Sequence, residues 1–260
     1  MAKDAKIILE TKGLTKHYGG VEALNDADFT MKDGEHIAIV GDNGAGKSTF
    51  VRNITGVEKP TSGEIIFDNE TVEFNAPIDA RNKGIETVYQ NLALADHLDV
   101  PANIFLGREE FRLNLGPFSI LNKRKMRARA DELLEETGIK IPDVSQKVMS
   151  MSGGQRQCVA ISRAAGWGSK LIIMDEPTAA LGIQETTRVE NIIRGLKKRG
   201  VPVLIISHNL RQVFNLVDKI AVFRQGRIVA MLDAKKTSGN EVVAMITGAD
   251  QGVHEGASYI

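Results

Sequence analysis

Short apolar runs alternate with amphipathic stretches along most of the chain. Five runs rich in β-branched and aliphatic residues are predicted as strands, over residues 37–40, 64–67, 171–174, 203–206 and 219–223. Several of them are apolar throughout, which is typical of parallel strands covered on both faces. Helical periodicity falls between them, over residues 49–55, 155–165 and 186–199. This alternation predicts an α/β fold built on a doubly wound sheet.

Two regions differ from this pattern. Residues 21–31 and 65–74 alternate polar and apolar positions beside Asp-Asn or Lys-Asp-Gly turns, which predicts an antiparallel β subdomain. Residues 123–137 are highly charged, with an apolar stripe at helical spacing that ends before Gly138. We therefore predict a helical subdomain over about residues 92–151, inserted in the α/β core. The alternative is an ordinary surface helix of the same domain.

Length and composition indicate one ordinary globular unit. The 260 residues are 42% hydrophobic and 25% charged, and 33 Lys and Arg balance 33 Asp and Glu. This neutral balance gives no general attraction to nucleic acid or to an anionic membrane surface. A single cysteine, Cys158, excludes an intramolecular disulfide and is expected to be a small buried core residue. We expect neither an export signal nor a membrane span, since no apolar run approaches ~18 residues.

A glycine-rich loop lies between the first predicted apolar strand and the helix that follows it. It reads Gly41, Asp42, Asn43, Gly44, Ala45, Gly46, Lys47, Ser48 and Thr49, and it matches the pattern G-x-x-x-x-G-K-[ST]. Glycines let backbone N–H groups turn inward around phosphate oxygens, and the next helix presents its positive end to the same anion. Lys47 would reach the β- and γ-phosphates of ATP while the Ser48 hydroxyl binds Mg²⁺.

Two adjacent carboxylates follow a second apolar strand. Asp175 and Glu176 end the run at residues 171–174, at an edge of a parallel sheet where ligands bind. Asp175 would hold Mg²⁺ through water, and Glu176 would polarise the attacking water. Successive strand residues face opposite sides, so we expect the two carboxylates to have different roles. The alternative is a polar strand end that enters the loop at Pro177.

Residues 151–155, at the start of the predicted helix before this strand, indicate which class of phosphate-loop protein this is. Met151, Ser152, Gly153, Gly154 and Gln155 closely resemble the LSGGQ motif of ABC ATPases, with Met151 in place of leucine. The resemblance implies that residues 152–155 bind the γ-phosphate held by a partner chain, and hence that two chains form a homodimer around two ATP molecules. Without that resemblance, Ser152 could simply cap the helix.

Three further residues match family positions. Tyr18 resembles the aromatic residue that stacks on adenine, Gln90 the glutamine that contacts Mg²⁺ and the attacking water, and His208 the histidine that positions this water with Glu176. The resemblance therefore implies catalytic roles for Glu176, His208 and Gln90. It also implies Mg²⁺ contacts from Ser48, Gln90 and Asp175. A core tyrosine, a surface glutamine and a structural histidine are the alternatives.

One position departs from the family pattern. The loop after the acidic strand usually reads Ser-Ala-Leu-Asp, but here Gly182 follows Ala179, Ala180 and Leu181. The family's aspartate helps to build the opposing site across the dimer interface. We therefore expect hydrolysis to be retained and communication between the two sites to be altered.

The resemblance covers residues 7–248, with 249–260 as a C-terminal tail, and implies a single nucleotide-binding domain that works with separate transmembrane permease subunits. Residues 103–108 would lie near the docking surface or simply pack onto the core. Residues 103–109, 179–182 and 241–248 look similar to bacterial monosaccharide importers of the ribose and fructose type, and the length is most similar to the fructose type. Such a subunit would bind ATP and Mg²⁺ at the cytoplasmic face of the bacterial inner membrane, and indirectly serve a periplasmic sugar-binding protein.

Two other functions remain open from the sequence. A soluble ABC ATPase clamp on nucleic acid or ribosomes is one, although the neutral charge balance disfavours it. A nucleotide-binding structural subunit with little hydrolysis is the other, and Gly182 motivates it.

Overall fold

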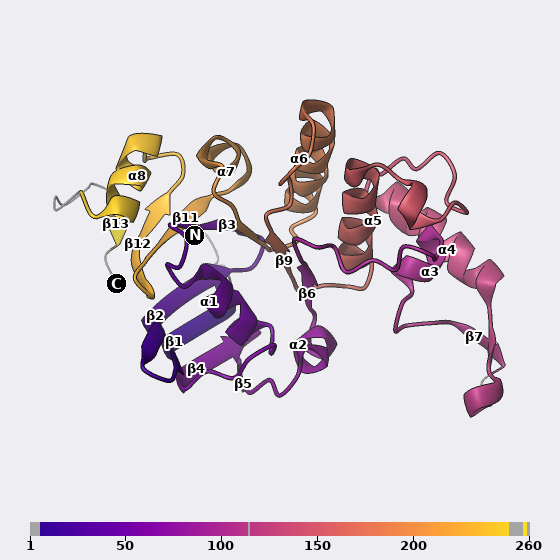
Figure 1. Cartoon of the computed structure of the whole chain (residues 1–260), viewed down its shortest axis with the longest axis horizontal. Helices are drawn as coiled ribbons and strands as arrows, with labels where there is room; N and C mark the ends of the chain where they lie inside the picture. Colours follow the sequence, from indigo (N-terminus) through magenta and orange to yellow (C-terminus); the bar gives the residue numbers. More distant parts are fainter. Residues whose placement is uncertain (1–5, 114, 250–256, 259–260) are drawn as a thin grey trace.

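Two larger β-sheets, a two-stranded β-hairpin and the helices make up the described part of the chain. The computed structural model describes residues 6–113, 115–249 and 257–258. A seven-stranded sheet runs through the centre, a four-stranded antiparallel sheet lies below one side of it, and helices cover the rest (Figure 1). Most of the predicted tail, residues 249–260, lies outside the described residues.

The seven-stranded sheet confirms the predicted α/β fold. Its order is β13-β12-β11-β3-β10-β9-β6, and the strands from β11 to β6 are parallel. β12 and β13 pair antiparallel at one edge. The bounds are β3 (His36–Gly41), β6 (Ile85–Val88), β9 (Leu171–Asp175), β10 (Val203–Ile206), β11 (Lys219–Arg224), β12 (Arg227–Asp233) and β13 (Ala257–Ser258).

Alternate residues of the central strands enter two different hydrophobic cores. In β3, Ile37 and Ile39 face the core shared with the small sheet, while Ala38 and Val40 face the core shared with the helices. This follows from the two-residue period of a strand, and it explains why these strands are apolar at every position. The sheet is therefore buried on both faces.

The four-stranded sheet is the predicted antiparallel subdomain. Its order is β2-β1-β4-β5. The bounds are β1 (Ile7–Tyr18), β2 (Val21–Lys32), β4 (Ser62–Phe67) and β5 (Glu70–Val72). β4 and β5 form the expected hairpin around Asp68 and Asn69, which both have positive φ. The segment 21–31 is also hairpin material as expected, because β2 pairs antiparallel with β1 across the turn at Gly19 and Gly20.

The helices begin close to the predicted positions. The structure has α1 (Lys47–Ile54), α2 (Pro77–Lys83), α3 (Val100–Ile104), α4 (Lys123–Glu136), α5 (Gly153–Ala165), α6 (Ile183–Lys198), α7 (Leu210–Leu216) and α8 (Gly239–Thr247), with short 3₁₀ turns η1 (Gly116–Phe118) and η2 (Val148–Ser150). α1 begins two residues earlier than predicted because its first turn is part of the glycine loop, where hydrophobic periodicity gives no signal. Among the helices of the described chain, none is long and apolar enough to cross a membrane.

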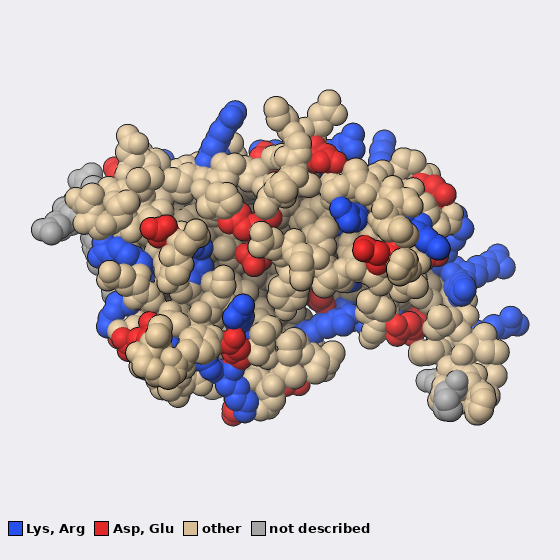
Figure 2. Space-filling view, in the orientation of Figure 1, with Lys and Arg blue, Asp and Glu red and all other residues tan. Residues whose placement is uncertain are grey.

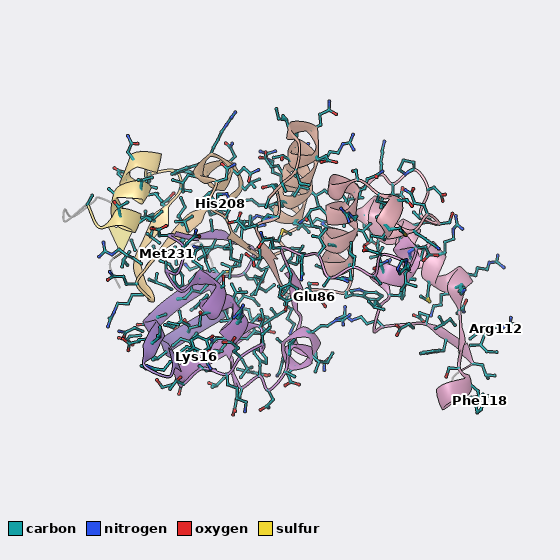
Figure 3. The ribbon with its side chains drawn as sticks, in the orientation of Figure 1. Lys16, Glu86, Arg112, Phe118, His208 and Met231 are labelled. Atoms are coloured by element: carbon teal, nitrogen blue, oxygen red, sulfur yellow. The ribbon has the colours of Figure 1, made fainter. Side chains whose placement is uncertain are left out.

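The predicted helical subdomain contains a β-hairpin that we did not predict. β7 (Phe111–Leu113) and β8 (Ile120–Leu121) form an arm that projects beyond α3 and α4 (Figure 1). Figure 3 places Arg112 and Phe118 on this arm, away from the body of the protein, and Phe118 is 79% exposed. The predicted apolar stripe of α4 is buried, and it consists of Met126, Ala130, Leu133 and Leu134. α4 therefore packs as predicted, while the arm before it does not pack onto the core.

Candidate nucleotide-binding site

The backbone conformation of the glycine loop requires glycine at two positions. Gly41 ends β3 with φ 154°, and Gly46 caps α1 with φ 105°. A Cβ at Gly41 would lie 2.4 Å from the Phe223 carbonyl oxygen, and one at Gly46 would lie 2.7 Å from the Ala23 carbonyl oxygen. The loop is therefore pressed against neighbouring backbone, and this conformation leaves the N–H groups of the first turn of α1 directed at an anion.

Lys47 folds back over this loop. Its ammonium group donates to the carbonyl oxygens of Gly41 and Asp42, at 2.8 Å each. Burial lowers the pKa of Lys47, and the nearby carboxylates of Glu176, Asp42 and Asp175 act against this shift. The cation thus lies between the loop and the acidic strand, where the β- and γ-phosphates of a nucleotide would meet it.

The two carboxylates at the end of β9, Asp175 in the strand and Glu176 directly after it, have different surroundings. Burial raises the pKa of Asp175, and the charge of Glu176 raises it further. Glu176 has φ 49°, in the left-handed region that a residue with a side chain rarely adopts, and its N–H donates to the Ile206 carbonyl oxygen at 2.9 Å. Strain of this kind, of order 1–3 kcal/mol, persists where the surrounding structure holds a functional side chain in place.

His208 fixes the direction of the Glu176 carboxylate. The backbone N–H of His208 and its ring Nδ1 lie 3.1 and 2.7 Å from the same oxygen, Glu176 Oε1. With the proton on Nδ1, the ring donates to the carboxylate and leaves Nε2 free to face a ligand. His208 lies between β10 and α7, with a side chain that is 76% exposed (Figure 3).

One cavity of about 370 Å³ brings these groups together. It is lined by loop residues, by the acidic pair and by the two predicted water-positioning residues, and these are Ala23, Asn43, Gly44, Ala45, Gly46, Lys47, Ser48, Thr49, Gln90, Asp175, Glu176, Ile206 and His208. Predicted residues from four separate segments therefore share a single site, and Ala23 and Ile206 line it as well. Gly41 and Asp42 do not line the cavity but accept hydrogen bonds from Lys47, which does.

The cavity offers oxygen donors that suit Mg²⁺. Ser48 contributes a hydroxyl, Gln90 an amide carbonyl and Asp175 a carboxylate, which are the hard ligands this ion prefers. Among the described residues no group of three or more His, Cys, Asp and Glu forms a metal cage. These donors therefore fit a Mg²⁺ ion whose remaining ligands are phosphate oxygens and water.

Tyr18 lies outside this cavity, at the end of β1. Its hydroxyl donates to the Glu58 carboxylate, and the Lys16 ammonium lies 5.3 Å from its ring centroid. Thr49 and Arg52 act on the same hydroxyl, so the ring lies beside α1. Burial raises the pKa of Tyr18, and the bond to Glu58 raises it further. Tyr18 is 42% exposed, and its stacking role stays a prediction.

The motif at residues 152–155 starts α5 at a different surface. Ser152 is the N-cap of α5, and its Oγ accepts from the Gln155 N–H at 3.3 Å while the Gln155 amide oxygen accepts from the Ser152 N–H at 2.9 Å. Ser152 therefore does cap the helix, as the alternative interpretation of this residue expected. The residues Ser152, Gly153, Gly154 and Gln155 do not line the cavity that Lys47 lines.

Sequence reasoning missed a carboxylate that contacts this motif. Glu185 Oε1 accepts from Ser152 Oγ at 2.8 Å and from the Gly154 N–H at 3.3 Å. Its Oε2 accepts from the Gly182 N–H at 3.3 Å. The spacing of Gly182 and Glu185, at the N-cap and the third helical position of α6, is a capping signal that could have indicated half of this arrangement.

The backbone conformation at position 182 does not require a glycine. It has φ −69° at the N-cap of α6, and a Cβ there would meet only Glu185 Oε2, at 3.9 Å. A side chain would therefore fit, so neither backbone conformation nor crowding explains the departure from the family's aspartate.

Comparison with known proteins identifies the family. Residues 24–179 match the family model described as ABC transporter. The fructose import ATP-binding protein FrcA of Rhizobium meliloti is 44% identical over 247 residues, covering 94% of this chain and 95% of that protein. The xylose/arabinose import ATP-binding protein XylG of Sulfolobus acidocaldarius is 43% identical, covering 92% and 94%.

Solved structures agree with this assignment. A nucleotide-free ATP-binding cassette from an ABC transporter superposes with a TM-score of 0.76 at 28% identity, over 94% of this chain and 96% of that one. A dimeric post-hydrolysis cassette bound to ADP and phosphate superposes with a TM-score of 0.73 at 25% identity, over 87% of this chain and 99% of that one. This chain belongs to the ABC transporter family, as an ATP-binding subunit whose ATPase activity is coupled to transport.

Proposed function

We propose that two copies of this chain close around two ATP molecules and that hydrolysis drives a sugar importer. The observation that carries the proposal is the division of groups between two surfaces. Lys47, Asp175, Glu176 and His208 share one cavity, while Ser152 begins a second anion-binding helix outside it. A nucleotide held by Lys47 therefore needs the Ser152 of another chain to complete its contacts.

The groups in the cavity divide the chemistry of hydrolysis. The loop N–H groups and Lys47 bind the phosphates, and Ser48, Gln90 and Asp175 hold Mg²⁺. Mg²⁺ would neutralise charge that develops on the phosphate oxygens. Glu176 accepts a proton from the attacking water, and His208 keeps that carboxylate directed at the water through the 2.7 Å contact to Nδ1.

The Glu176→Gln variant tests this proposal. Glutamine retains the size of the side chain and its contact with His208 but cannot take the proton, so ATP should remain bound and hydrolysis should fall by roughly 100-fold or more. The expected result is an ATP-dependent dimer in analytical ultracentrifugation, together with loss of phosphate release. Glu73→Gln, at an exposed carboxylate paired with Lys59, is the matched control. Normal phosphate release from Glu176→Gln, or a protein that stays monomeric with ATP, would refute the mechanism.

The cargo follows from the relatives. FrcA and XylG are named as import ATP-binding proteins for fructose and for xylose or arabinose, and a 39% identical protein of Rubrobacter xylanophilus is named for ribose import. We assign the chain to monosaccharide uptake, with fructose as the first sugar to examine. These relatives favour import over the nucleic-acid clamp. The mixture of acidic and basic side chains over most of the face in Figure 2 is also unlike a basic nucleic-acid surface.

A separate permease would dock beside α2 and α3. A groove of about 430 Å³ lies there, and its walls include Ile78, Arg81, Glu86 and Leu106. Of the predicted docking segment, Asn103 is buried and holds Ala95 through two hydrogen bonds, so it packs in the core. Leu106 is 40% exposed at the groove. The chain would thereby lie peripherally at the cytoplasmic face of the membrane and respond to a periplasmic sugar-binding protein through the permease.

Uptake measurements test the cargo assignment. A strain without this chain should lose uptake of one labelled monosaccharide among fructose, ribose, xylose and arabinose. Wild-type chain and Lys59→Ala should restore uptake, whereas Lys47→Ala should not. Unchanged uptake of all four sugars would contradict the assignment.

A further inference from the structure

The carboxylate of Glu185 already occupies the donors of the Ser152 motif. Ser152 Oγ donates to Glu185 Oε1 at 2.8 Å, and the Gly154 N–H donates to the same oxygen at 3.3 Å. The Ser152 Oγ also accepts from the Gln155 N–H, so its single proton is directed at Glu185. These contacts lower the pKa of Glu185, with the Ser152 bond as the largest cause, and the group is therefore an anion at neutral pH.

The packing between α5 and α6 makes room for this carboxylate. A Cβ at Gly154 would lie 2.7 Å from Glu185 Cγ and 2.8 Å from its Cβ and Cδ. Non-bonded contacts of a Cβ are essentially never this short, so this position of the Glu185 side chain requires a glycine at residue 154. The glycine that lets a phosphate approach the helix start thus also lets Glu185 approach it.

One acceptor excludes another at these donors. A hydroxyl has one proton to donate, and so has a backbone N–H. A γ-phosphate that took Ser152 and Gly154 would have to remove Glu185 from both, and two anions would otherwise lie side by side without a cation between them. Arg188, one turn further along α6, already interacts with Glu185 and offers it another partner on the same helix.

We propose that Glu185 competes with the partner chain's γ-phosphate for Ser152 and Gly154, and so makes dimer closure depend on a nucleotide that has a γ-phosphate. The inference rests on the proposed two-chain ATP site. Glu185 is then a specificity-determining residue of that site, because ADP bound at Lys47 has no group that can replace the carboxylate. Since Glu185 Oε2 also holds the Gly182 N–H, the exchange frees the first turn of α6, which follows the segment carrying Glu176.

The test measures how much ATP is needed to close the dimer. The full chain carrying Glu176→Gln is the parent, and Glu185→Gln or Glu185→Asp is added to it. Glutamine removes the charge, whereas aspartate keeps the charge and helix-capping ability but is too short to reach Ser152. We expect the ATP concentration at half-maximal dimer, measured by ultracentrifugation, to fall about 3- to 10-fold in both variants, as loss of one charge-assisted hydrogen bond would produce.

Glu190→Gln is the matched control on the same helix. Glu190 is paired with Arg194 at 2.9 Å and does not contact the Ser152 motif, so the ATP requirement should stay at the parent value. ATP binding to the monomer, measured below the dimerisation concentration, should be unchanged in every Glu185 variant. A purely structural role for Glu185 would lower thermal stability without lowering the ATP requirement.

Two outcomes would overturn the inference and they can be told apart. An ATP requirement that is unchanged or higher in Glu185→Gln and Glu185→Asp would mean that Glu185 does not compete with phosphate, while the proposed function stands. A Glu176→Gln parent that forms no dimer at any ATP concentration would remove the proposed function and this inference together.

Discussion

The N-termini of α1 and α5 can both bind a phosphate group. They differ in the charge of the side chain that lies next to them. At α1 the loop approaches through glycines, and the nearby side chain is a cation, Lys47. At α5 the start is capped by Ser152, and the nearby side chain is an anion, Glu185. The first site attracts a phosphate, and the second holds a carboxylate that the phosphate must replace.

This difference predicts an order of events. ATP binds first at Lys47, because that site gains a counter-charge without losing an acceptor. Closure against Ser152 comes second, because it exchanges one anion for another. A subunit built in this way hydrolyses ATP only after two separate binding steps, and each step can be altered by substitutions at its own helix.

The largest effect should come from the cation at the first helix start. Lys47→Ala removes the charge that faces the β- and γ-phosphates, so hydrolysis should fall by roughly 1,000-fold, in the range seen when one donor to transition-state charge is lost. Phosphate release and nucleotide binding by calorimetry measure this. Lys59→Ala removes an exposed lysine paired with Glu73 and should leave both unchanged. ATPase activity within a few-fold of wild type would place phosphate recognition elsewhere.

The next effect concerns the residue that directs Glu176. His208→Ala removes the 2.7 Å contact to Glu176 Oε1, and the turnover number should fall by roughly 100-fold while the KM for ATP changes little. A double variant with Glu176→Gln should be no slower than Glu176→Gln alone, because both changes act on one proton transfer. Additive losses would show that His208 acts independently of Glu176.

Most of the site at the start of α1 could be predicted from the sequence, but only part of the site at the start of α5. The loop from Gly41 to Thr49 is contiguous, and a buried strand with its own periodicity leads into it, so local signals identified it. β9 and the pair Asp175 and Glu176 were found for the same reason. Gln90 and His208 required a family resemblance, because a lone residue after a strand carries no chemistry of its own.

Contacts between segments that are distant in the sequence could not be predicted from it. Glu185 lies 33 residues from Ser152, and only the packing of α5 against α6 brings them together. β1 was not predicted because its polar and apolar positions are set by two partner strands, with register shifts along both pairings. The arm formed by β7 and β8 was missed because six of its large apolar side chains are exposed, which inverts the usual pattern: Phe111, Leu113, Leu115, Phe118, Ile120 and Leu121.

A smaller effect concerns the strand that carries the first helix start. His36 begins β3, is fully buried, and its Nε2 lies 3.1 Å from the Val201 carbonyl oxygen. Burial, with a smaller contribution from the charge of Lys197, lowers the pKa of His36 to about 4. Since an unfolded histidine has a pKa near 6.5, the unfolded chain binds more protons between these values. The free energy of unfolding should therefore fall as pH drops from 6.5 towards 4.

Denaturant unfolding at two pH values measures this. The contribution of His36 should be about 2 kcal/mol smaller at pH 5 than at pH 7.5. His36→Gln should remove that part of the pH dependence, whereas His97→Gln, at an exposed histidine, should preserve it. An identical pH dependence in wild type and His36→Gln would contradict the assignment of this sensitivity to β3.

The smallest expected effect is that of Tyr18 on ATP affinity. It concerns nucleotide binding at Lys47 and not dimer closure at Ser152. Tyr18 lies beside α1, so Tyr18→Ala should weaken ATP binding to the monomer by about 5- to 10-fold through loss of aromatic stacking. Tyr18→Phe keeps the ring and loses only the contacts of the hydroxyl, chiefly the bond to Glu58, so its affinity should stay within about 2-fold of wild type. GTP affinity should fall in parallel with ATP affinity, because every base has a face on which a ring can stack. If Tyr18→Phe were as weak as Tyr18→Ala, the Glu58 bond rather than stacking would carry the effect, and the first binding step would depend on how β1 is held against α1.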